Sequence, residues 1–143
     1  MVWTTQETTT HQDHVIAHVI GATVLGSFVF DESIYVLLDI GFLWRVYLDG
    51  EMGLLPTSVT IEELDAEVEI KEQLKIDCDR LSHQAVGEAG DLKQMTRAPS
   101  ECAIDDVTLQ RNGEDWRLLL HGEQNTLGIQ ASMSVRIIEL LQL

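Results

Sequence analysis

The sequence predicts a mainly β, single-domain protein, an antiparallel barrel or two-layer sandwich built from meanders, with one or two short helices. Two observations carry this prediction. Between Ala22 and Asp49, three apolar runs are separated by short turn-forming pieces, which is typical of an antiparallel meander. Between Val107 and Leu141, a second set of apolar runs joined by turn signals would form a second meander of similar size.

Chain length favours one folded unit, with residues 1–10 as a disordered N-terminus and residues 11–143 as a single β-rich domain. A chain of 143 residues buries about 70% of its unfolded surface, which is enough for a core without metal or disulfide support. The first ten residues, MVWTTQETTT, are polar and threonine-rich. They lack a basic region followed by an apolar one, so no signal peptide is expected.

Residues 11–20 are expected to form a short helix. Thr10 is placed to cap it, Asp13 would lie in its first turn, and Gly21 would end it. The four β-branched residues of this segment weaken the expectation, because they have reduced helix propensity.

In the first meander, alternation predicts which side chains face the core. In each of the second and third runs, one parity is apolar: Ile34, Val36, Leu38 and Ile40, then Phe42, Trp44, Val46 and Leu48. In the first run Val24, Phe28 and Phe30 would share a face, and Gly26 between them indicates a bulge or a close backbone approach. Asp49-Gly50 predicts a hairpin that returns the chain to Leu55.

The second face of this meander is not cleanly polar, because Val29, Leu37, Leu43 and Tyr47 would lie on it. Either another part of the chain covers it, or it is a surface for a partner or a second subunit. Leu37, Leu43 and Tyr47 are therefore the candidate partner-binding residues.

The segment from Leu64 to Asp79 alternates apolar and polar residues over sixteen positions, which favours a half-buried strand or hairpin. Its content of Glu, Lys, Gln and Leu favours a helix instead. On a helix, however, its apolar residues would form two groups that are out of phase. The strand is preferred, and the alternative is an α+β fold with residues 61–85 helical.

Residues 82–100 have no apolar period and form the main predicted loop. Asn112-Gly113 then predicts a second hairpin, and the runs 126–131 and 133–141 would complete the second meander. The tail SVRIIELL could also form a helix.

Charge restricts the classes of partner. The chain has 24 acidic and 9 basic residues, for a net charge of −15. Such a surface disfavours nucleic acid and anionic membranes and favours a basic protein partner or simple solubility. No apolar stretch is long enough for a membrane span. The two cysteines form no disulfide framework, so a cytoplasmic location is expected.

The best candidate for a metal site is His11, His14 and His18, which would share one face of a helix. Imidazole nitrogens bind zinc and other divalent transition metals. The segment lacks the glutamate of an HExxH motif, so no cofactor is firmly expected.

No nucleophile elbow, Walker loop or dinucleotide-binding motif is present. Carboxylates occur in pairs at turns, as Asp31-Glu32 and Asp49/Glu51, but turns favour aspartate for local hydrogen bonding. Enzymatic activity is therefore not expected. The sequence favours a non-catalytic interaction protein that self-associates, with a metal-binding protein or metal-dependent enzyme, or a carrier of a small apolar ligand inside a barrel, as alternatives.

Overall fold

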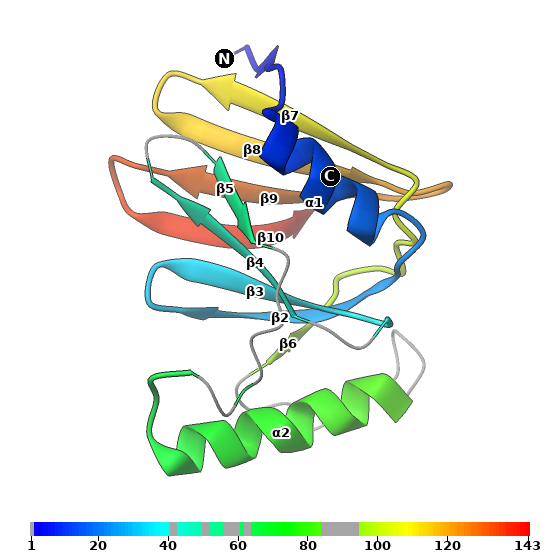
Figure 1. The fold of residues 1–143 in the computed structure, drawn as a ribbon, viewed down its shortest axis with the longest axis vertical. Coiled ribbons are helices and arrows are strands. Elements are labelled where there is room, and N and C mark those ends of the chain that lie inside the picture. The colour runs from blue at the N-terminus through cyan, green and yellow to red at the C-terminus, as the bar shows by residue number, and fades with distance from the viewer. Residues whose placement is uncertain (1, 41–42, 50–51, 56–60, 62–63, 84–94) are drawn as a thin grey trace.

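The computed structural model describes residues 2–40, 43–49, 52–55, 61, 64–83 and 95–143 (Figure 1). Two helices and ten strands follow one another along this described part of the chain. They are β1 (Thr4–Thr5), α1 (Thr10–Val19), β2 (Val24–Phe30), β3 (Ser33–Leu38), β4 (Leu43–Leu48), β5 (Met52–Leu55), α2 (Val68–His83), β6 (Thr96–Arg97), β7 (Asp106–Asn112), β8 (Asp115–His121), β9 (Thr126–Ser132) and β10 (Ile137–Gln142).

The strands form two antiparallel sheets of five. Sheet I has the order β5-β4-β3-β2-β6, and sheet II has the order β1-β7-β8-β9-β10. Sheet II packs on one face of sheet I, and α2 lies along the other face, so the molecule has three layers (Figure 1). The two sheets by themselves form a two-layer sandwich, to which α2 adds the third layer. The predicted fold class is therefore confirmed as a sandwich and not a barrel, because the described strands form two separate sheets.

The main core lies between the two sheets. Its members on sheet I include the predicted inward parity of β3 and β4, with Trp44, Ile34 and Leu38 among the largest fully buried side chains. Sheet II contributes alternate residues of β7, β8 and β9, which are Val107, Leu109, Trp116, Leu118, Leu120, Leu127, Ile129 and Ala131. Two-residue periodicity therefore identified the side of β3 and β4 that faces sheet II, because successive side chains of a strand point to opposite faces.

Both consequences expected of Gly26 are found. The pairing of β2 with β3 shifts register between Val24 and Gly26, and an added Cβ at Gly26 would lie 2.6 Å from Cδ1 of Leu81 in α2. The bulge reverses the side-chain parity along β2. Val24 therefore faces sheet II while Phe28 faces α2, and the prediction that they share a face is wrong for this reason.

Most of the segment from Leu64 to Asp79, which the sequence analysis preferred as a strand, belongs to helix α2. The alternative prediction, with residues 61–85 helical, describes this segment better. The first of the two apolar groups is Ile61, Leu64 and Val68. The helix begins at Val68, so Ile61 and Leu64 lie before it. The second apolar group lies wholly within the helix and shares one helix face. Its members form the stripe that packs against sheet I: Ile70, Leu74, Cys78 and Leu81. The strand prediction failed because the apparent alternation joined two segments, and because Val68 and Ile76, which completed it, are exposed.

The two predicted hairpins are confirmed. β4 pairs with β5 and β7 pairs with β8, although Gly50 and Glu51 of the first turn lie outside the described residues. The helix expected at residues 11–20 is also confirmed, but its N-cap is Thr9 and not Thr10, and Thr9 forms a capping box with Gln12. The tail is strand β10 and not a helix. Most of the predicted loop, residues 84–94, lies outside the described residues.

Candidate functional site

The three histidines of α1 do not converge. His14 and His18 are exposed neighbours with ring centroids 5.0 Å apart, whereas the Nε2 atom of His11 is hydrogen-bonded to the main-chain oxygen of Leu54 at 3.1 Å. In the described parts of the chain, no group of three or more His, Cys, Asp or Glu side chains could hold a metal ion. The pair His14 and His18 could supply two ligands at most.

His11 and Gln12 instead cover the outer edge of sheet I. The Nε2 amide of buried Gln12 donates to the main-chain oxygen of Met52 at 2.6 Å, next to the bond from His11 to Leu54. Both acceptors belong to the edge strand β5, which has β4 on its other side. An uncovered edge invites pairing with another chain, and α1 blocks this one with side chains.

The N-terminal residues, expected to be disordered, cover the edge of β7 in sheet II. Thr4 and Thr5 pair with Arg111 and Gln110. The Trp3 ring anchors this segment, because it lies 4.3 Å from the guanidinium of Arg117, within the range of cation–π attraction.

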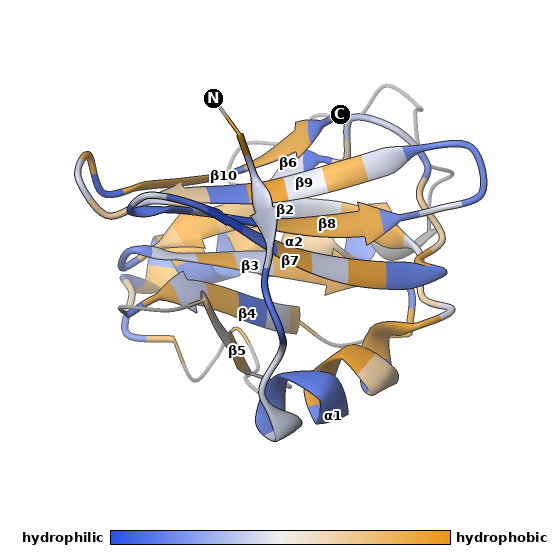
Figure 2. Ribbon diagram, turned by 90° about the horizontal axis from the view of Figure 1, so that it is seen from above, coloured by the Kyte–Doolittle hydropathy of each residue, from blue (hydrophilic) through white to orange (hydrophobic). Residues whose placement is uncertain are grey.

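The opposite edge of sheet II, β10, has no such cover among the described residues. β10 pairs with β9 over six residues in unbroken register, and it contains no proline, lysine or bulge to discourage pairing. Figure 2 shows β10 and α1 on opposite sides of the molecule. By contrast, the far edge of sheet I ends in β6, which has two residues.

The orientation of the β10 main chain follows from one hydrogen bond. The Leu143 amide donates to the main-chain oxygen of Thr126 at 2.9 Å. Alternate residues of an antiparallel strand bond to the same neighbour, so Ile137, Glu139 and Leu141 direct their N–H and C=O groups to β9. The even-numbered residues, Ile138, Leu140 and Gln142, direct theirs away from β9, to the edge. We call these outward groups the β10 edge.

Apolar side chains accompany the β10 edge. Ile137 and Leu143 are 55% and 51% exposed, and Val135 in the turn before β10 is 62% exposed. Glu139 is the only charged residue within the strand. Thus this edge offers hydrogen bonds and apolar surface with little of the negative charge found over the chain as a whole.

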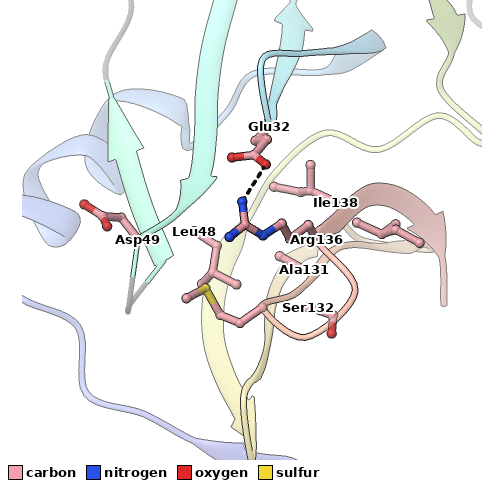
Figure 3. Close-up of a pocket in the computed structure, with 9 residues that line it drawn as sticks. Glu32, Leu48, Asp49, Ala131, Ser132, Arg136 and Ile138 are labelled. Atoms are coloured by element: carbon pink, nitrogen blue, oxygen red, sulfur yellow. Dashed lines mark hydrogen bonds and ion pairs between the residues drawn. The ribbon is translucent and has the colours of Figure 1, made fainter.

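A small pocket lies where β10 begins (Figure 3). Its volume is about 200 Å³, and three turns meet around it, those of β2–β3, β4–β5 and β9–β10. Its apolar lining includes Leu48 and Ile138, and Glu32, Asp49 and Arg136 provide its charges. The guanidinium of Arg136 reaches across the gap between the sheets to the Glu32 carboxylate at 3.3 Å. Cofactor and drug-sized ligand sites usually have about 300–1,000 Å³, so this pocket fits a single side chain better.

Backbone strain gathers at the same pocket. The described non-glycine residues with positive φ are Asp31, Glu32 and Arg136, at 51°, 60° and 54°. This conformation costs about 1–2 kcal/mol for a residue with a Cβ atom. The ion pair between Glu32 and Arg136 is 68% and 77% exposed at its side chains, and such pairs contribute only about 0–1 kcal/mol. The pair therefore does not offset the strain of its two turns.

Substitution of Arg136 tests this balance. Arg136→Gly and Arg136→Ala both remove the ion pair, but only glycine is unstrained at φ 54°. The glycine variant should be more stable than the alanine variant by about 1 kcal/mol. Urea unfolding of the two variants measures the difference, and equal midpoints would show that the turn is not strained.

Leu37 and Leu43, two of the three candidate partner-binding residues, are buried beneath α2. The second face of the first meander is therefore covered by another part of the same chain, which was the first of the two interpretations. These leucines cannot reach a partner in the folded protein. Tyr47 is half-buried and its ring lies over Gly53, where it also contacts the Arg45 guanidinium at 4.9 Å.

The two cysteines are unpaired. Cys102 is 1% exposed, because its main-chain oxygen accepts from the Val24 N–H, and its side chain lies in the core between the sheets. Burial, together with Asp77 and Asp79, raises the pKa of Cys78 to about 12. Both thiols are poor nucleophiles at neutral pH, since the thiolate is the reactive form.

The β10 edge and Arg136 were not among the residues singled out in the sequence. One feature of the sequence could have indicated the β10 edge, because the last strand of a meander lies at the edge of its sheet.

No described helix has the length and apolar content to cross a membrane. Compared with protein-family models, with curated proteins and with solved structures, the chain matches none.

Proposed function

We propose that this chain is a non-catalytic interaction protein that self-associates by adding a strand to the β10 edge. The observation that carries the proposal is the contrast between sheet edges. β5 is covered by α1 and β7 by the N-terminal residues, while β10 presents six regular residues without cover in the described chain. Main-chain hydrogen bonds supply the affinity in this mode of binding.

Composition supports a binding role over catalysis. The chain lacks nucleophile motifs, and its described histidines, cysteines and carboxylates do not form a metal cluster. A carrier role was expected to use the interior of a barrel, and the sandwich has none. Two unpaired cysteines suit a reducing compartment, so a cytoplasmic location is part of the proposal.

Long-range charge should oppose this association, because each chain carries −15. Added salt screens such repulsion, and the contact itself involves few charges. The dimeric fraction should therefore rise with salt concentration. A basic partner bound to the acidic surface would show the opposite dependence, since salt weakens attraction between unlike charges.

Sedimentation velocity of the protein and of Gln142→Pro tests the proposal. Gln142 is exposed and its N–H belongs to the β10 edge, so proline removes one edge donor and leaves the pairing with β9 intact. We expect a concentration-dependent dimer for the parent chain and a monomer for the variant, both with the same circular dichroism spectrum. A parent chain that stays monomeric at every concentration and salt level would refute the proposal.

A further inference from the structure

The direction of the β10 main-chain groups restricts how a second chain can pair there. Hydrogen bonds across a new antiparallel contact must join residues whose groups point to the edge on both strands. For β10 these are Ile138, Leu140 and Gln142, since Leu143 bonds to Thr126 and fixes the alternation. If the partner is β10 of another copy, an even-numbered residue must therefore face an even-numbered residue.

We propose that β10 pairs antiparallel with β10 of a second copy about a two-fold axis at Leu140. This inference rests on the proposed function and names its partner strand and register. Leu140 then faces its own counterpart, and Ile138 faces Gln142 of the other copy. All three outward residues exchange hydrogen bonds within the bounds of the strand, and the two copies of sheet II become one continuous sheet.

Neighbouring registers fit less well. An axis at Ile138 or Glu139 would pair part of the edge with residues 134–136, which lie in the turn where Arg136 has φ 54°. An axis at Glu139 would also place two glutamates directly opposite each other, which is destabilising. An axis at Leu141 would leave Ile138 without a partner inside β10, because its counterpart would lie past Gln142, where the strand ends.

The register at Leu140 also accounts for exposed apolar side chains. On the outer face it places Ile137 opposite Leu143 of the second copy, at both ends of the contact. These residues are 55% and 51% exposed in the single chain. Glu139 lies opposite Leu141, so no like charges are directly opposed. The strand is thus complementary to itself in hydrogen bonding and apolar surface.

Disulfide trapping distinguishes the registers. Directly opposed residues outside the hydrogen-bonded pairs have Cα atoms about 4.5 Å apart, within disulfide range, whereas diagonal neighbours at about 7–8 Å exceed the limit of about 7 Å. Glu139→Cys and Leu141→Cys are prepared separately. Each is oxidised alone and after mixing, and dimers are counted on non-reducing gels, with the parent chain as control for Cys78 and Cys102.

With the axis at Leu140, the thiol introduced by Glu139→Cys in one chain faces the thiol introduced by Leu141→Cys in the other. Cross-linked dimer therefore forms in the mixture and in neither variant alone. Cross-linking of Glu139→Cys alone places the axis at Glu139, and cross-linking of Leu141→Cys alone places it at Leu141. Either result overturns the register, as does a dimer in sedimentation that yields no cross-link. If sedimentation shows only monomer, the proposed function itself fails.

Discussion

The Asp77→Ala variant is expected to lose about 3 kcal/mol of folding free energy, because it removes a buried charged acceptor. Asp77 is completely buried. One carboxylate oxygen accepts from the main-chain N–H of Met95 at 3.1 Å and the other from Nε2 of Gln73 at 3.0 Å. Alanine would leave the buried Met95 amide without this acceptor, and the hydrogen bond that joins Met95 to α2 would be lost.

Two variants separate this effect from a general loss of helix stability. Glu72→Ala changes an exposed residue of the same helix, and exposed substitutions cost about 0.5 kcal/mol or less. Asp77→Asn keeps one acceptor oxygen and should lie between the two. Urea unfolding midpoints measure all three, and an Asp77→Ala protein as stable as Glu72→Ala would show that the Met95 contact does not matter.

Proline at Glu139 is expected to destabilise the chain by about 3 kcal/mol, whereas proline at Gln142 should cost less than about 1 kcal/mol. Both side chains are exposed, so the difference isolates the main-chain N–H groups. The N–H of Glu139 points to β9 and is lost from the ladder, while that of Gln142 points away from the sheet, as the bond from Leu143 to Thr126 implies.

Thermal unfolding of the two proline variants, performed at a concentration where both are monomeric, provides the comparison. The parent chain at the same concentration is the reference. A reversed order, with Gln142→Pro the less stable, would mean that the outward and inward residues of β10 have been exchanged, and the β10 edge would then consist of different residues.

Strands were easier to predict from this sequence than α2. Trp44 and Val46 are buried between the sheets and alternate with half-buried Arg45 and Tyr47, and that period is visible in the sequence. In α2 the stripe of Leu74 and Leu81 was obscured by exposed apolar residues, and helix propensity gave the better answer. Local alternation cannot show where one element stops and another begins.

The candidate site depended on relations that a sequence does not display. Glu32 and Arg136 are far apart in the chain and meet because two turns come together at one end of the sandwich. The covering of β5 by His11 and Gln12 likewise requires knowledge of where α1 packs. The histidine motif was visible, but the sequence does not show that the first of its three members, His11, is hydrogen-bonded to the main chain of β5.

Amide hydrogen exchange along β10 tests the central claim most directly. At a concentration where the dimer predominates, the amides of Ile138, Leu140 and Gln142 should be protected together with those of Glu139 and Leu141. On dilution to monomer, the three outward amides should exchange rapidly while Glu139 and Leu141 remain protected by β9. Rapid exchange of the outward amides at every concentration would contradict the claim that a second chain covers this edge.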